Sequence, residues 1–312
     1  NNLSIKNFKS VKDLKMDCKR INVIIGKPNV GKSNILEAIS LLNPLHLPSN
    51  NVKFLSDFIR YEDFSNLFYD DKISSSIEIT ADNLNTIINW DIKNHSEDSY
   101  IFLNGDQDFL SQIKNQNDFS IDEFNSHKKH NRIEKSLNPF YANIRSSGEV
   151  LNNSLSLSYS ELKIKKYTFK TKHSFPSKFN TFLLPPHGDN LLSIIENNID
   201  LKKEIGEIFS QYGLEFVIYK KGNAFEIQKN QDGIVNKYNY TSIADTFQRF
   251  IFYLAVIDSN NNSCIVLEEP EVHSFPPYTK ELSDRIIDST ENQFFITTHS
   301  PYLLENLISN LD

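Results

Sequence analysis

The sequence predicts an α/β protein with a phosphate-binding loop at its centre, and three observations carry this prediction. A glycine-rich octet at 26–33 stands between a short apolar run and a helical pattern. Two later apolar runs, at 264–267 and 293–296, are followed by acidic residues and by a histidine. Near the N-terminus apolar and polar residues alternate, as in strands with one buried face. We therefore expect a mixed or parallel sheet together with an N-terminal antiparallel element.

Composition limits the function classes. The chain has 312 residues, 39% of them apolar, and 23 phenylalanines, which allow one large α/β domain or two smaller ones. A net charge of −7 argues against extensive coating of nucleic acid, although it allows a local basic patch. Cys18 and Cys264 make neither a disulfide framework nor a zinc pattern, so we expect a reducing cytoplasm. The longest apolar run, Phe250–Ile257, is too short to span a bilayer, and no signal peptide is visible. Because the only methionine is Met16, we expect a trimmed start, and because the chain stops soon after a helix begins, we expect either a longer natural protein or a compact one with little after residue 312.

The octet has the pattern Gly-x-x-x-x-Gly-Lys-Ser, and each part serves phosphate binding. Glycines let backbone N–H groups approach phosphate oxygens, and the helix that follows directs its positive end at the same anion. Lys32 would contact the β- and γ-phosphates, and the Ser33 hydroxyl would ligate Mg²⁺. The strand Val23–Ile25 before the loop and the helix from Asn34 to about Leu42 after it supply the required context. The residues predicted to bind the nucleotide are Gly26, Lys27, Pro28, Asn29, Val30, Gly31, Lys32, Ser33 and Asn34.

The other elements follow from periodicity and turn residues. In the first 93 residues we expect strands at Leu3–Val11, Leu14–Cys18, Ser75–Thr80 and Ile87–Ile92, a helix stop at Pro44 and Pro48, and a short helix and loop over Leu55–Phe68. From 179 onward we expect helices at Leu191–Asn197 and Leu201–Tyr212 and a meander of Phe216–Tyr219, Ala224–Gln228 and Val235–Tyr238.

Between these parts the pattern weakens, and residues 94–178 are predicted to be an insertion that separates the two parts of the phosphate-loop domain, 1–93 and 179–312. Weak helical periodicity occurs near Phe109–Ile113 and Ile121–Phe124, and strands are expected at Ser154–Tyr159 and Tyr167–Thr171. His127 and His130 lack partner ligands, and Asp106 and Asp108 follow no apolar strand, so we predict neither as a metal site. The five lysines of 163–172 are expected to form a solvated face, with contact to nucleic acid or a partner as the alternative.

Three downstream segments carry the remaining chemistry. Ser242 and Asp245 have capping-box spacing before the buried helix Ile243–Ile257, so this helix start is a candidate anion site. A capped core helix without a ligand is an equally good interpretation of this segment. Glu268 and Glu269 end an apolar strand, at the sheet edge where α/β proteins bind ligands. There Glu268 would hold Mg²⁺ through water and Glu269 would polarise the attacking water.

The third segment ends its strand in His299, placed to bond a γ-phosphate or the attacking water, with Ser300 capping a helix that begins at Pro301. Together, the octet, the helix start at 242–246, the Glu-Glu-Pro-Glu of 268–271 and the Thr-Thr-His-Ser of 297–300 resemble ABC-type ATPase heads. Within these the chain resembles the group related to SMC, Rad50 and OLD proteins, and it is similar to ATPases of prokaryotic phage-defence systems such as PARIS.

The resemblance covers about residues 1–92 and 180–307. It implies an ABC-ATPase-like P-loop core that binds ATP and Mg²⁺, with Gly26–Ser33 as Walker A, Glu268 at the Walker B metal position, Glu269 as catalytic base and His299 as switch histidine. It also implies that Ser242–Thr246 stands at the signature, which reaches the nucleotide of a facing subunit. There the chain has Ala244-Asp245 in place of the usual Ser-Gly pair, which speaks against a standard two-head sandwich. The Q-loop position is expected near Phe64–Phe68, where Asn66 is the available amide.

The leading functional hypothesis is a Mg²⁺-dependent ATPase that acts as a conformational switch. ATP would join subunits into a homo-oligomer, a dimer or larger, and hydrolysis would release them. By resemblance, the output is anti-phage defence through an effector or a phage protein, with nucleic acid as a possible partner and no membrane. The alternatives are a DNA-repair or nucleic-acid-handling ATPase, which the lack of sustained heptads disfavours, and a slow ATP-bound sensor scaffold. The absence of an Asn-Lys-x-Asp motif disfavours a GTPase, and a kinase has no use for Glu-Glu-Pro-Glu paired with Thr-Thr-His.

Overall fold

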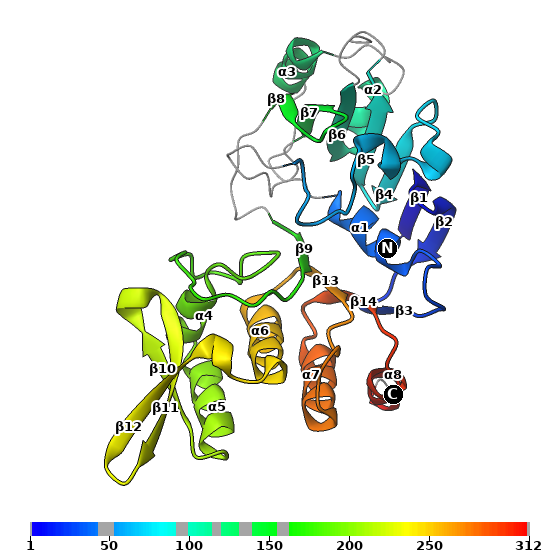
Figure 1. The fold of residues 1–312 in the computed structure, drawn as a ribbon. Coiled ribbons are helices and arrows are strands. Elements are labelled where there is room, and N and C mark those ends of the chain that lie inside the picture. The colour runs from blue at the N-terminus through cyan, green and yellow to red at the C-terminus, as the bar shows by residue number, and fades with distance from the viewer. Residues whose placement is uncertain are drawn as a thin grey trace. The chain divides into compact units, whose positions relative to one another are not determined.

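The computed structural model describes residues 2–42, 53–91, 99–113, 120–130, 139–154 and 162–310 (Figure 1). The chain divides into two compact units between Lys165 and Lys166. Unit 1 denotes the residues up to Lys165, and unit 2 those from Lys166 onward. In the described ranges no helix is long and apolar enough to cross a membrane.

Unit 1 is built around an antiparallel sheet. Its strands pair in the order β2-β1-β4-β5-β6-β7-β8, each antiparallel to its neighbour, which confirms the predicted N-terminal antiparallel element. The strands of unit 1 are β1 (Asn2–Phe8), β2 (Val11–Asp17), β3 (Ile21–Ile24), β4 (Ile77–Ala81), β5 (Leu84–Trp90), β6 (Ser99–Asp106), β7 (Phe140–Arg145) and β8 (Val150–Asn153), and β9 (Ile164–Tyr167) crosses the boundary between the units. The helices of unit 1 are α1 (Lys32–Ser40), α2 (Gln107–Ile113) and α3 (Ile121–His130).

Both faces of this sheet are covered. On one face the end of α1 is tied to β5, where the Thr86 hydroxyl donates to the Leu41 carbonyl at 2.9 Å, and Phe54 packs edge-on against Phe102 of β6. On the other face α2 and α3 complete a buried cluster of Ile87, Ile101, Leu103, Phe109, Leu110, Phe124 and Tyr141. The sheet therefore gives α1, and the loop that precedes it, a rigid support.

The region predicted as an insertion supplies β6, β7 and β8 to this same sheet, since β6 pairs with β5 along its whole length. That residues 94–178 interrupt an ATPase domain, with boundaries at 93 and 178, stays a prediction. Asp106 ends β6, and its carboxylate accepts a hydrogen bond from the Phe109 N–H at 2.7 Å, so it caps α2. Apart from residue 154, the strand predicted at 154–159 lies outside the described residues, as do Pro44, Pro48 and the side chains of His127 and His130.

Two predicted strands have wrong boundaries. The strand predicted over Leu3–Val11 ends at Phe8, because Lys9 adopts a left-handed φ of 48° and the chain reverses before Val11. The strand predicted at Tyr167–Thr171 lies earlier, at β9. The alternation of apolar and polar residues cannot show such a reversal or shift, because the same alternation continues through the turn and into the flanking residues.

Unit 2 combines a meander, a parallel strand pair and a helical layer. Its strands are β10 (Glu215–Tyr219), β11 (Ala224–Gln231), β12 (Ile234–Asn239), β13 (Cys264–Glu268) and β14 (Gln293–Thr297). Its helices are α4 (Leu191–Asn197), α5 (Ile199–Ser210), α6 (Asp245–Ser259), α7 (Pro276–Asp288) and α8 (Pro301–Ser309). The antiparallel meander β10-β11-β12 and the parallel pair β13–β14 are confirmed. Helix α7 packs between α6 and α8 (Figure 1).

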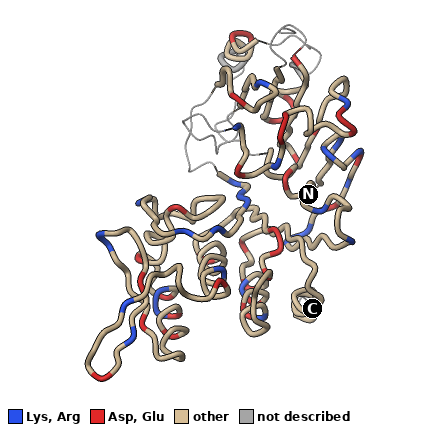
Figure 2. The backbone as a smooth tube through the Cα atoms, in the orientation of Figure 1, with Lys and Arg blue, Asp and Glu red and all other residues tan. Residues whose placement is uncertain are grey.

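Basic and acidic residues are interspersed along both units (Figure 2).

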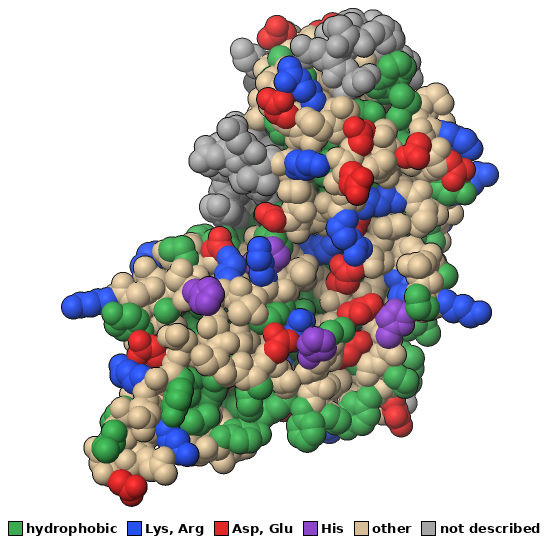
Figure 3. Space-filling view, viewed as in Figure 1, with side chains coloured by type: hydrophobic (Ala, Val, Ile, Leu, Met, Phe, Trp, Pro, Cys, Tyr) green, Lys and Arg blue, Asp and Glu red, His purple; other side chains and the backbone are tan. Residues whose placement is uncertain are grey.

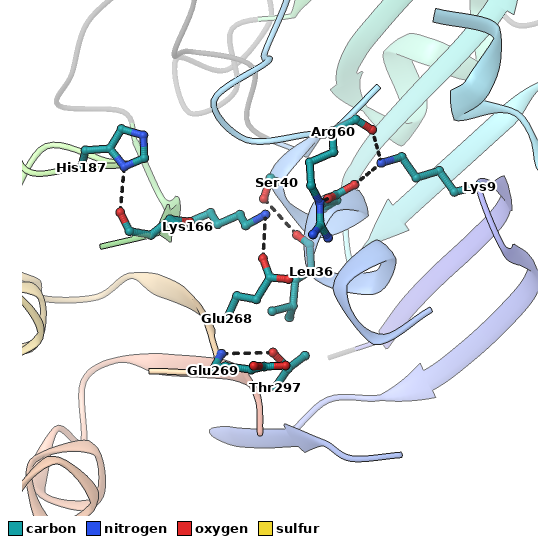
Figure 4. A network of polar contacts seen from close by, with 11 residues as sticks. Lys9, Leu36, Ser40, Arg60, Lys166, His187, Glu268, Glu269 and Thr297 are labelled. Atoms are coloured by element: carbon teal, nitrogen blue, oxygen red, sulfur yellow. Dashed lines mark hydrogen bonds and ion pairs between the residues drawn. The ribbon is translucent and has the colours of Figure 1, made fainter. Parts of the chain in front are cut away.

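One acidic side chain of unit 1 is fully buried and paired with two basic residues. Glu37 of α1 accepts hydrogen bonds from Lys9 and, at 2.7 Å, from Arg60 Nε, although its side chain has no exposed surface. Figure 4 shows the side chains of Lys9 and Arg60 close together, where the Lys9 ammonium also donates to the Arg60 carbonyl. The pairing joins α1 to the β1–β2 turn and to the segment that follows residue 53.

Replacing Glu37 with alanine should lower the free energy of unfolding by about 3 kcal/mol, because it leaves the Lys9 ammonium largely buried without its carboxylate. Urea denaturation measures the change. Glu62→Ala is the matched control, since Glu62 is an exposed acid of the same unit. Equal stability of the two variants would contradict the assignment.

Candidate nucleotide site

The phosphate loop lies in unit 1. Gly26, Lys27, Pro28, Asn29 and Val30 form an exposed turn after β3. Gly31 then caps α1, and Lys32, Ser33 and Asn34 form its first turn, so the helix begins two residues earlier than predicted.

Lys32 is folded back over the loop. Its side chain is buried, and its ammonium donates to the carbonyls of Gly26 and Lys27 at 3.0 and 2.9 Å. The positive charge is therefore held at the loop, beside the amino end of α1, where an anion is favoured by both the helix dipole and the free N–H groups.

Gly31 is the position in the loop where the structure requires glycine. Its φ is 91°, and a Cβ built there would lie 2.4 Å from the Ser10 hydroxyl oxygen. That hydroxyl accepts a hydrogen bond from the Asn34 side chain at 2.8 Å. The β1–β2 turn is thus packed directly against the phosphate loop.

Gly31→Ala should therefore weaken ATP binding and cost about 1–3 kcal/mol of stability, because the new methyl group forces both a strained φ and a clash with Ser10. Titration with a fluorescent ATP analogue and thermal denaturation measure these effects. Gly206→Ala is the matched control, since Gly206 lies inside α5 with no atom near the added Cβ. Wild-type affinity in Gly31→Ala would refute the packing argument.

Asn66, the candidate Q-loop amide, has a local partner. Its side-chain oxygen accepts from the Asp63 N–H at 3.0 Å, in a capping box that starts a 3₁₀ turn at Phe64. It lines an open cavity of about 800 Å³ within unit 1, together with Lys9, Ser10 and Arg60. Because Ser10 also contacts the phosphate loop, this cavity lies next to the loop.

The acidic pair lies in unit 2, at the carboxyl end of β13. Strand β13 runs parallel to β14, with Glu268 opposite Thr297. Glu268 Oε2 lies 3.6 Å from the ammonium of Lys166, which is buried (Figure 4). The prediction of a solvated lysine face is therefore wrong at Lys165 and Lys166, which are both buried, and burial lowers the pKa of Lys165 to about 8.

Glu269 has an unusual backbone. Its φ is 44°, in the left-handed region, and its N–H donates a hydrogen bond to the Thr297 carbonyl at 3.0 Å (Figure 4). Its carboxylate oxygen Oε1 lies 3.4 Å from Nε2 of His299, and both side chains are partly exposed. Polar residues whose backbone is held in a strained conformation are often found at functional sites. The strand ends thus bring the predicted base and the predicted switch histidine together.

The helix after His299 begins as the sequence predicts. Ser300 is the N-cap of α8, its hydroxyl accepts from the Leu303 N–H at 3.2 Å, and Pro301 occupies the first turn. This cap fixes where β14 ends and where the His299 backbone turns.

The predicted capping box at Ser242 is wrong. Helix α6 begins at Asp245 with Ala244 as N-cap, and Ser242 is the exposed last residue of a separate 3₁₀ turn. The Asp245 carboxylate instead accepts from Arg249 and lies 3.3 Å from Nδ1 of His273. An acid at the first helical position already satisfies the dipole there, so the physical case for an anion at this end is weaker. Nucleotide binding by Ser242 and Asp245 stays a prediction.

Sequence reasoning missed the lysine beside Glu268. Lys166 sits in a lysine-rich run, and nothing in the pattern of that run indicates that its ammonium lies 3.6 Å from Glu268 Oε2. The predicted ligands, Ser33 in unit 1 and Glu268 in unit 2, each carry an oxygen of the kind that Mg²⁺ prefers. Among the described residues, no group of three or more His, Cys, Asp or Glu side chains is arranged to hold a metal ion. Magnesium bound to a nucleotide usually takes only one or two protein oxygens and completes its shell with phosphates and water.

Comparison with known proteins identifies the family. The model of the family described as "AAA domain, putative AbiEii toxin, Type IV TA system" matches residues 21–305. The chain belongs to this family. A curated relative from Helicobacter pylori, named "ATP/GTP phosphatase", is 24% identical over 97% of this chain and 86% of its own length.

Solved structures of low similarity include the SMC head domain from Thermotoga maritima, at 12% identity and a TM-score of 0.39, covering 98% of this chain and 90% of that one. An Smc head domain from Pyrococcus furiosus, bound to the C-terminal domain of ScpA, matches at 13% identity and a TM-score of 0.47 over 98% of this chain and 90% of that one. The family match agrees with the ATPase class that the motifs predict, and that prediction is confirmed.

Proposed function

We propose that this ATPase hydrolyses Mg²⁺-bound ATP with Glu269 as base and uses the cycle as a conformational switch. The observation that carries the proposal is the Glu269–His299 pair at the ends of two parallel strands, with the base held in a strained backbone conformation. Carboxylates and histidines at this edge of an open α/β sheet are positioned for ligand chemistry.

The proposed roles follow from the chemistry of each side chain. Backbone N–H groups of Gly26–Ser33 and the Lys32 ammonium bind the phosphates of ATP, and Lys32 exchanges its loop carbonyls for phosphate oxygens. Ser33 and Glu268 would hold Mg²⁺, which neutralises charge developing on the phosphates when bound. Glu269 accepts the proton of the attacking water at its carboxylate, and His299 orients that water and the γ-phosphate.

We further propose that ATP joins copies of this chain, that hydrolysis releases them, and that this cycle acts on a protein partner in anti-phage defence. The defence role rests on the resemblance of the motifs. Support for a protein partner comes from large hydrophobic side chains that unit 2 exposes at Tyr212, Ile234, Tyr238 and Phe275. Figure 3 shows hydrophobic side chains gathered over the lower part of this unit. Such patches are typical of interaction surfaces.

The direct test measures phosphate release from ATP by the purified protein, with Mg²⁺ and with EDTA, alongside its mass in ADP and in a slowly hydrolysed ATP analogue. We expect turnover only with Mg²⁺ and a larger assembly with the analogue. Absence of turnover with Mg²⁺ would overturn the proposal of hydrolysis, and one mass in both nucleotides would overturn the switch.

The defence role is tested by phage plaque counts on cells that express the chain with its neighbouring genes. Protection that disappears in Lys32→Ala would support it. Equal plaque counts with and without the wild-type chain, over a broad phage panel, would contradict it.

A further inference from the structure

We infer that Glu271 is the positioning residue for His299. Glu271 follows β13 in the loop that leads to α7, and it is 9% exposed. Its Oε1 accepts hydrogen bonds from the Thr298 hydroxyl and, at 3.3 Å, from the His299 N–H. One buried acid thus holds both the residue before the histidine and the histidine's own backbone. The inference rests on the proposed role of His299.

The bonding of Glu271 is one-sided. Its Oε2 is buried and has no hydrogen-bond partner in the part of the chain that the structure describes. A buried polar atom without a partner costs about 1–3 kcal/mol, and the two hydrogen bonds that Oε1 accepts must offset this cost. Both bonds come from Thr298 and His299, so the Glu271 carboxylate fixes the segment directly after β14.

The same loop also carries the proposed base. Glu269 and His273 both adopt left-handed φ values, 44° and 60°, and the Val272 N–H donates to the Glu269 carbonyl at 3.1 Å. The Glu269 backbone is tied to Thr297, and the Glu271 side chain is tied to the next two residues of that strand end. Glu271 therefore sets how the His299 ring faces the Glu269 carboxylate.

The local turn extends this control. The Thr298 hydroxyl, which donates to Glu271, accepts from the Ser300 N–H at 2.9 Å. Ser300 in turn caps α8. Removal of Glu271 would release the 298–300 turn and would leave the residues of the phosphate loop unchanged, so we expect an effect on turnover and not on ATP affinity.

Three substitutions separate positioning from packing. Glu271→Ala removes the acceptor, Glu271→Gln keeps an acceptor oxygen at the same reach, and Thr298→Val removes the hydroxyl bond while leaving the acid. Glu291→Ala, at an exposed acid before β14, is the matched control. Each is measured for kcat, KM and thermal stability, in the wild-type and in the His299→Ala background.

We expect Glu271→Ala to lower kcat about tenfold or more with little change in KM, and Glu271→Gln to recover most of that loss. In the His299→Ala background the further loss from Glu271→Ala should shrink to less than about twofold, since a residue acting through His299 has nothing left to position. If Glu271→Ala does not fold, Thr298→Val, which removes the stronger hydrogen bond to Glu271 and leaves the acid, provides the same comparison between the two backgrounds.

Equal losses in the two backgrounds, or a Glu271→Gln variant as impaired as alanine, would overturn the inference. The NMR signals of the His299 ring supply a readout that needs no turnover: they should shift in Glu271→Ala and stay unchanged in Glu291→Ala. Unshifted ring signals in Glu271→Ala would contradict this inference but not the proposed function. An inactive wild-type protein would contradict the proposed function, and a shifted ring signal in Glu271→Ala would then still support the positioning role of Glu271.

Discussion

Glu269→Gln is expected to hydrolyse ATP at least about 10²-fold more slowly than the wild type while binding it normally, because an amide cannot accept the proton of the attacking water. Glutamine keeps the size of the side chain and the approach to His299 Nε2, now 3.4 Å from the carboxylate. Phosphate release in single and multiple turnovers measures the rate, and a fluorescent ATP analogue measures the affinity. The variant should accumulate in the ATP-bound assembly.

The control for this result is Glu305→Gln, which changes an exposed acid of α8. The neighbouring acid gives a second comparison. Glu268→Gln should raise the Mg²⁺ concentration needed for half-maximal turnover, because Glu268 is assigned to the metal and not to the proton. Unchanged turnover in Glu269→Gln would defeat the base assignment, and identical Mg²⁺ dependence in Glu268→Gln would defeat the metal assignment.

Lys32→Ala should lower the affinity for ATP about 10- to 100-fold, since charge-assisted hydrogen bonds to phosphate contribute about 1.5–3 kcal/mol. The effect has two sources in this structure. The ammonium is lost as a phosphate ligand, and the carbonyls of Gly26 and Lys27 lose the donor that shapes the loop. Equilibrium titration with a fluorescent ATP analogue measures the change.

Lys12→Ala is the matched control, because Lys12 is an exposed lysine of β2 outside the phosphate loop. The two alanine variants remove the same charge from unit 1, so a general electrostatic effect would weaken both equally. Similar affinities in the two variants would show that Lys32 does not bind the phosphates.

Local patterns were enough to predict the elements that carry chemistry. The strand before Glu268, the strand before His299 and the Ser300 cap are local features, each set by a short apolar run or by one hydroxyl. The phosphate loop is likewise a local feature, because the spacing of its glycines and its lysine is enough to predict its backbone geometry. The Ser242 capping box failed because the backbone at Ile243 is extended, so the helix begins only at Asp245.

What the sequence by itself determined is the chemistry of this protein: a glycine loop with its lysine, two acids after one buried strand and a histidine after another. Each of these motifs is a continuous stretch of sequence, so it can be recognised without knowing which distant residues it contacts. The tertiary structure alone decided which buried charges are paired, with Lys166 beside Glu268 and Glu37 between Lys9 and Arg60. Only the tertiary structure showed that the Glu271 carboxylate accepts a hydrogen bond from the His299 N–H, because the two residues follow different strands and helix α7 lies between them in the chain.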